Sequence, residues 1–139
     1  MQKIVVAYDG SEHADRALDR AVQLATWSGA ELIVVSAAKL TALLHDPALG
    51  ASAVDPIEVE WARENLDKAR ARLADTGMVV RTVEAHGDPE DAIVRLAEEE
   101  NANLIAVGTR GLNAAQRALL GSVSTKIVHN AHCDVLVVR

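Results

Sequence analysis

The chain has 139 residues, half of them apolar, with two Trp, one Tyr and no Phe, and its formal net charge is −6. This length predicts one globular domain over residues 1–139. The acidic balance and the scarcity of aromatic residues argue against a nucleic-acid binder, which needs a basic surface and often stacking side chains. A single cysteine, Cys133, excludes an internal disulfide and any zinc site built on two or more cysteines.

The first part of the chain alternates between strand-like and helix-like patterns. Residues 4–8 are a short run rich in β-branched residues, typical of a strand buried on both faces of a parallel sheet. From Glu12 onward, small and apolar residues recur at three- and four-residue spacing, which predicts a helix. Ser11 stands where the N-cap of that helix belongs, and Gly29 where the helix should end. A second buried strand is predicted over residues 32–36.

The middle of the chain begins with its least regular stretch. Residues 39–57 contain two Asp-Pro pairs and predict a long surface loop, with room for a short helical turn. A helix follows over residues 59–73 and closes at Gly77, and residues 79–85 form the third predicted strand.

The last third repeats the alternation. Asp88 and Pro89 begin a third helix, as its N-cap and its first position. Residues 104–107 are the fourth predicted strand, residues 121–122 open a fourth helix, and residues 135–138 are the last strand. Strands and helices that alternate in this way predict a parallel sheet with helices on both faces, joined by right-handed crossovers.

Ligands of such sheets bind at the carboxyl ends of the strands, and two motifs should meet there. The first is residues 9–11, Asp-Gly-Ser, after strand one; Asp9 alone could equally serve to cap the first helix. The second is Gly-Thr-Arg-Gly at residues 108–111, followed after nine residues by Gly-Ser at 121–122.

Glycines in the second motif permit positive φ and let the backbone approach a ligand, and the start of a helix attracts anions. The hydroxyl groups of Ser122 and Ser124 add hydrogen-bond donors. The motif is therefore typical of a phosphate site, although turn and cap roles would also explain each glycine separately. It lacks the lysine of the common phosphate loop.

With this spacing of Gly, two residues, Gly, nine residues, Gly and Ser, the sequence resembles the nucleotide-binding type of the universal stress protein family. The resemblance covers the whole chain, including the opening strand and turn at residues 3–11 and the last strand at 133–138. It implies an α/β fold of the adenine nucleotide α-hydrolase type, an open five-stranded parallel sheet in the order 3-2-1-4-5 with two helices on each face. Two positions depart from the usual family sequence, Ser36 in place of His and Asp134 in place of Pro.

The resemblance also implies a set of nucleotide-binding residues. Asp9 would contact the ribose or a Mg²⁺ ion on the phosphates, the backbone of Ala37 would face adenine, and the glycine motif would hold the phosphates. The full set is Ala7, Asp9, Ala37, Gly108, Arg110, Gly111, Gly121, Ser122, Val123 and Ser124.

The resemblance therefore implies a regulatory protein that binds ATP, ADP or AMP with Mg²⁺ and acts as a nucleotide-dependent sensor toward a protein partner. The family pairs its last strand across a two-fold axis, which implies a homodimer through Val135–Val138. No residue is clearly placed as a general base, so a dedicated enzyme is not expected. The alternatives are a slow Mg²⁺-dependent ATPase of the same fold and a nucleotide-free dimeric scaffold. No apolar run reaches the ~20 residues that span a bilayer, and no signal-peptide pattern is seen, so a cytoplasmic protein is expected.

Overall fold

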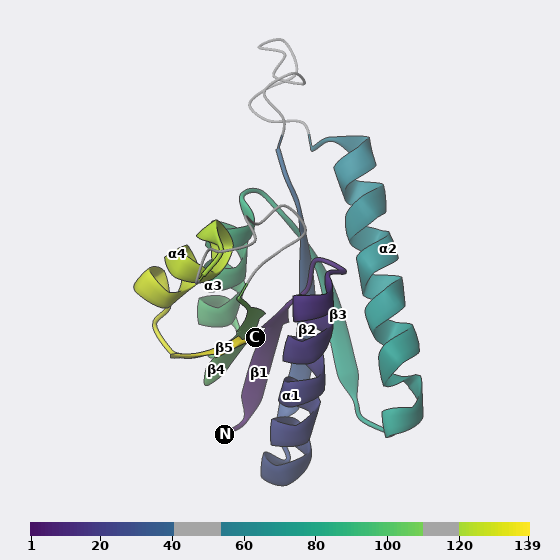
Figure 1. Cartoon of the computed structure of the whole chain (residues 1–139), viewed down its shortest axis with the longest axis vertical. Helices are drawn as coiled ribbons and strands as arrows, with labels where there is room; N and C mark the ends of the chain where they lie inside the picture. Colours follow the sequence, from purple (N-terminus) through teal and green to yellow (C-terminus); the bar gives the residue numbers. More distant parts are fainter. Residues whose placement is uncertain (41–53, 110–119) are drawn as a thin grey trace.

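The computed structural model describes residues 1–40, 54–109 and 120–139 (Figure 1). Its strands are β1 (Lys3–Ala7), β2 (Glu31–Ala38), β3 (Val80–His86), β4 (Leu104–Gly108) and β5 (Asp134–Val138). Its helices are α1 (Glu12–Ser28), α2 (Pro56–Leu73), α3 (Pro89–Glu99) and α4 (Ser122–Asn130), with a short 3₁₀ turn, η2 (Ala74–Thr76), after α2. No helix in these described ranges is both long and apolar enough to cross a membrane.

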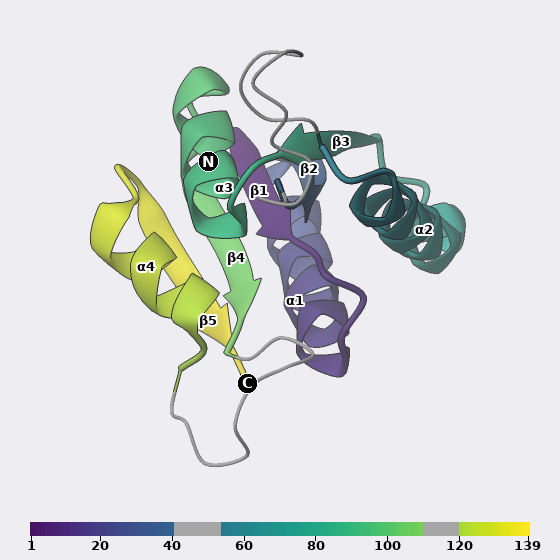
Figure 2. The same ribbon diagram turned by 90° about the horizontal axis from the view of Figure 1, so that it is seen from above.

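The five strands form one parallel sheet in the order β3-β2-β1-β4-β5. Helices α1 and α2 cover one face, and α3 and α4 cover the other (Figure 2). The predicted fold class, strand order and placement of helices are therefore confirmed. In this order the chain leaves β1 toward one edge and later returns to β4 beside it, so the strand order reverses between β1 and β4, where ligands of open α/β sheets bind.

The core consists of two layers of aliphatic side chains, one on each face of the sheet. Alternation along β1 shows the division, because Ile4 and Val6 pack under α1 and α2 whereas Val5 packs under α3 and α4. All three side chains are fully buried. Such two-sided burial explains why the strand sequence shows no polar alternation.

Local sequence signals fix most helix ends. The Ser11 side chain caps α1 by accepting the backbone N–H of Ala14, and Gly29 ends the helix in the left-handed conformation, with φ of 71°. Both expectations are confirmed. Helix α2 begins at Pro56, three residues earlier than predicted, because the Asp55 side chain caps it by accepting the N–H of Ile57.

Candidate functional site

The carboxyl ends of β1 and β4 lie side by side because the two strands pair in parallel. After β4, Thr109 Oγ1 and His13 Nδ1 of α1 share a hydrogen bond of 3.2 Å. A Cβ atom placed on Gly108 would lie 2.8 Å from both the carbonyl carbon and the Cβ of His13. The end of β4 thus packs directly on the first turn of α1.

Gly108 corrects one expectation about the glycine motif. The sequence suggests glycine here because it permits a positive φ and a close backbone approach, but the Gly108 backbone is not in the left-handed region. The structure requires glycine at this position because the His13 backbone leaves no space for a side chain. The reason for glycine at this position is a tertiary contact with a residue 95 positions away in the sequence, which no local sequence pattern could reveal.

The turn between β1 and α1 is ordered by its own side chains. Asp9 Oδ1 accepts the N–H of Ser11 at 3.0 Å, and Ser11 Oγ accepts the N–H of Ala14 at 3.1 Å. Gly10, between them, has a φ of +79°. Asp9 therefore orders the entry to α1, as the alternative interpretation expected, while its second carboxylate oxygen has no partner among the described residues. The capping role and a ligand role are compatible.

Thr109 joins four parts of the fold at this edge of the sheet. Its N–H donates to the Val138 carbonyl of β5 at 2.8 Å. Its own carbonyl accepts the N–H of Gly121 at 2.5 Å and the hydroxyl of Ser124 at 3.2 Å. Together with the His13 contact, these bonds place the start of α4 beside the ends of β4 and β5 and the start of α1.

Helix α4 begins without a side-chain cap. Gly121 occupies the N-cap position with φ of −72° and ψ of 168°, and its carbonyl accepts the N–H of Thr125. The backbone N–H groups of the first turn have no acceptor within a helix, and no side chain accepts them at the N-cap. The hydroxyl of the buried Ser124 is shared between the Thr109 and Gly121 carbonyls. The group of Ser124 that could donate to a phosphate is therefore its backbone N–H, and not its hydroxyl.

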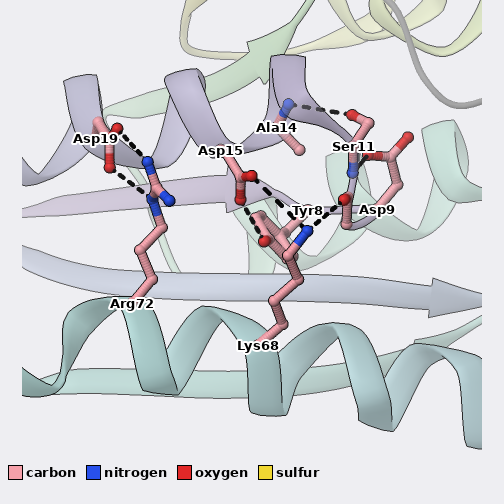
Figure 3. Close-up of polar contacts among 9 residues, drawn as sticks. Tyr8, Asp9, Ser11, Ala14, Asp15, Asp19, Lys68 and Arg72 are labelled. Atoms are coloured by element: carbon pink, nitrogen blue, oxygen red, sulfur yellow. Dashed lines mark hydrogen bonds and ion pairs between the residues drawn. The ribbon is translucent and has the colours of Figure 1, made fainter.

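Helix α2 supplies contacts to the site that the sequence did not reveal. Asn65 is buried and donates from Nδ2 to Ser36 Oγ at the end of β2, at 3.2 Å. Lys68, on the same face of α2, donates from Nζ to the Gly10 carbonyl at 2.8 Å and lies 3.7 Å from Asp15 Oδ2 (Figure 3). The only sequence signal was indirect, since a buried Asn on an otherwise apolar helix face needs a polar partner.

A buried tyrosine completes this polar group. Tyr8 donates from its hydroxyl to Asp15 Oδ1 at 2.5 Å (Figure 3). Burial raises the pKa of Tyr8 well above its ordinary value, and the hydrogen bond and negative charge of Asp15 raise it further. The tyrosine therefore stays neutral and serves as a hydrogen-bond donor.

The structure brings most of the sequence-predicted site residues to one edge of the sheet. Ala7, Asp9 and Gly108 lie at the neighbouring ends of β1 and β4, Ala37 lies near the end of β2, and the residues from Gly121 to Ser124 form the start of α4. Arg110 and Gly111 fall outside the described residues. Within the described ranges no three His, Cys, Asp or Glu side chains gather as a metal site.

Known proteins resemble this chain over nearly its whole length. The sequence profile of the universal stress protein family matches residues 1–139. Universal stress protein YxiE of Bacillus subtilis is 36% identical, over 99% of this chain and 98% of its own. A crystal structure of a universal stress protein in complex with cAMP is 35% identical with a TM-score of 0.68, covering 99% of this chain and 97% of the other. Universal stress protein UspA from Lactobacillus plantarum is 26% identical with a TM-score of 0.78, covering 99% and 97%. The chain belongs to the universal stress protein family.

Proposed function

We propose that this protein binds an adenine nucleotide at the carboxyl ends of β1 and β4, with the phosphates at the start of α4. One observation carries the proposal: the Gly121–Thr109 hydrogen bond holds an uncapped helix start beside the ends of these strands. The helix dipole and first-turn N–H groups that no side chain of the described residues caps favour a phosphate there. The relative solved with bound cAMP, at 35% identity, supports an adenine nucleotide as the ligand.

The proposed ligand is ATP, ADP or AMP, with Mg²⁺ on the phosphates. Mg²⁺ in nucleotide sites is commonly held by one or two carboxylates together with phosphate oxygens. Asp9 fits this role, since among the described residues it accepts one hydrogen bond, from the Ser11 N–H to Oδ1. The ion would neutralise phosphate charge, and Oδ2 of Asp9 would be the ligand that this chain contributes to the ion.

We further propose that nucleotide occupancy acts as a signal through a homodimer that pairs β5 with its copy. The two edges of the sheet differ in character. Edge strand β3 carries Arg81 and Glu84, which form ion pairs, and His86, which shares a hydrogen bond with Glu84. Strand β5, by contrast, is apolar from Val135 to Val138 and half-buried. An uncovered apolar edge strand is a template for pairing with another chain. A two-fold dimer would cover it.

A direct test measures binding of ATP, ADP, AMP and cAMP by titration calorimetry, with and without Mg²⁺, for the wild type and Gly121→Val. Any residue can adopt the Gly121 backbone angles, so the variant should fold while its branched side chain obstructs the phosphates. Ala131→Val is the matched control, at the other end of α4 and also in extended backbone. Loss of binding only in Gly121→Val supports the site, and unchanged affinity in that variant would contradict it.

The dimer is tested separately by sedimentation of the nucleotide-free and nucleotide-bound protein. We expect a mass twice the 14.8 kDa of the chain. A monomer in both states would contradict the proposed assembly and leave the nucleotide site unaffected.

A further inference from the structure

We propose that Lys68 of α2 is a positioning residue for the nucleotide site, because it fixes where the turn formed by Asp9, Gly10 and Ser11 sits. This inference rests on the proposed function. Lys68 lies 58 positions from Gly10 in the sequence, and its Nζ donates to the Gly10 carbonyl at 2.8 Å (Figure 3). It would act through the turn, without itself contacting the nucleotide.

The turn needs an external anchor because its internal hydrogen bonds fix only its shape. Asp9 accepts from Ser11 and Ser11 accepts from Ala14, so every internal partner belongs to the turn or to the first turn of α1. The residue before the turn is tied to β2, because the Tyr8 N–H donates to the Val35 carbonyl at 2.8 Å, but neither internal bond links the turn to α2. Lys68 supplies that link, and its ammonium group is also 3.7 Å from Asp15 Oδ2 on α1.

A second contact shows that α2 fits closely against the same residue. A Cβ atom on Gly10 would lie 2.5 Å from Asn65 Oδ1, so glycine is required there by space as well as by its positive φ. Asn65 also donates to Ser36 at the end of β2. Helix α2 therefore contacts Gly10 with two side chains, one of which also reaches β2.

The same two helices offer a matched control, one helical turn further along α2. Arg72 binds Asp19 of α1 in a bidentate pair, with Nε at 2.8 Å from Oδ1 and Nη2 at 2.6 Å from Oδ2. Like Lys68, it bridges α2 to α1, but among the residues that the structure describes its hydrogen bonds go to Asp19 and none reaches the turn (Figure 3). Comparing the two basic residues separates positioning of the turn from general attachment of α2.

The experiment compares Lys68→Met, Lys68→Arg and Arg72→Met by two measurements. The first is the dissociation constant for Mg-ATP. The second is hydrogen exchange of the Ser11 and Ala14 amides in the nucleotide-free protein. We expect Lys68→Met to weaken Mg-ATP binding roughly fivefold, because the binding-competent turn becomes a minor population, and to accelerate exchange at both amides. Lys68→Arg keeps a donor and should restore both values, while Arg72→Met should lower the melting temperature alone.

Two outcomes overturn the inference, and they differ from failure of the proposed function. Unchanged exchange at Ser11 in Lys68→Met, with normal wild-type binding, overturns the role of Lys68 only. Equal loss of affinity in Lys68→Met and Arg72→Met also overturns it, since both would then act through α2 as a whole. A wild type that binds neither Mg-ATP nor AMP overturns the proposed function itself and with it the site that Lys68 was to position.

Discussion

All four helices begin at the carboxyl ends of the strands, and the neighbouring starts of α1 and α4 differ in one respect. Helix α1 starts at Ser11, whose side chain accepts a backbone N–H of the first turn. Helix α4 starts at Gly121, which has no side chain to do so. In a capped helix start, a side chain already accepts one of the first-turn N–H groups. In an uncapped start, those N–H groups remain available as donors to an anion. In the proposed site, this contrast assigns the phosphates to the start of α4 and not to that of α1.

The two helix starts nevertheless depend on each other. His13 in the first turn of α1 contacts Gly108 and shares a hydrogen bond with Thr109, and Thr109 in turn binds Gly121. The first turn of α1 therefore helps to position the start of α4, through Thr109. Five variants test this comparison: three alter a helix start or the contact between the two starts, and two, Ser28→Ala and Glu100→Gln, change residues away from them.

The largest effect on stability is expected where the two regions meet. Gly108→Ala would place a methyl group 2.8 Å from the His13 backbone, which cannot rotate away. Overpacking of this kind should lower the free energy of unfolding by about 3 kcal/mol. Urea unfolding followed by circular dichroism measures it. A variant as stable as the wild type would show that the contact between β4 and α1 is loose.

The next prediction concerns nucleotide affinity and uses a variant that gives α4 a side-chain cap like that of α1. Gly121→Asp introduces a cap residue whose carboxylate accepts the first-turn N–H groups and repels phosphate. We expect affinity for ATP to fall about 100-fold, while the nucleotide-free protein gains a few tenths of a kcal/mol. Titration calorimetry checks the loss of ATP affinity, and thermal melting of the same nucleotide-free sample checks the gain in stability. A cap that leaves ATP affinity intact would place the phosphates elsewhere.

The reverse change removes the cap of α1. Ser11→Ala leaves the Ala14 N–H without its acceptor in a buried position, which should lower the free energy of unfolding by about 1 kcal/mol. Ser28→Ala is the control at the other end of α1, where the exposed hydroxyl donates to the Leu24 carbonyl. Chemical denaturation of both variants should show a loss for Ser11→Ala that clearly exceeds the loss for Ser28→Ala.

The smallest effect is a pH response near the amino ends of the strands, far from the candidate site. Hydrogen bonds from Arg81, at 2.6 Å, and then from Lys3, at 3.1 Å, lower the pKa of Glu100 to about 2. Because the folded pKa lies below the unfolded value of about 4.3, these pairs stabilise the fold above that pH, and the gain is lost as pH falls toward 2. Melting curves of Glu100→Gln should therefore show a shallower loss over this window than those of the wild type, with ATP affinity at neutral pH unchanged in the variant.

The fold could be predicted from the sequence because its signals are local. Ser11 and Gly29 mark the ends of α1 by rules that need only neighbouring residues, and both are confirmed. Unbroken β-branched runs predicted buried parallel strands, and the strand order followed from the family resemblance. Helix α2 was placed three residues late because Asp55 was assigned to a loop, although it caps the helix.

The site could be predicted only in part because its geometry depends on distant residues. The glycine motif located the start of α4, but the need for glycine at position 108 comes from His13. The contacts of Asn65 and Lys68 come from a different helix, and nothing in the residues around them indicates which turn they reach. The nucleotide contacts of the predicted site residues stay predictions.

The hydrogen bond from Thr109 to Val138 has a thermodynamic consequence. One end of this bond adjoins the proposed phosphate site, and the other is the last residue of the edge strand proposed to pair between subunits. If nucleotide binding and subunit pairing each shift this shared bond, they are linked equilibria. Linkage is reciprocal, so the factor by which ATP strengthens or weakens the dimer must equal the factor by which dimerisation changes the affinity for ATP. In such a protein, the apparent nucleotide affinity would depend on how much of the protein itself is present.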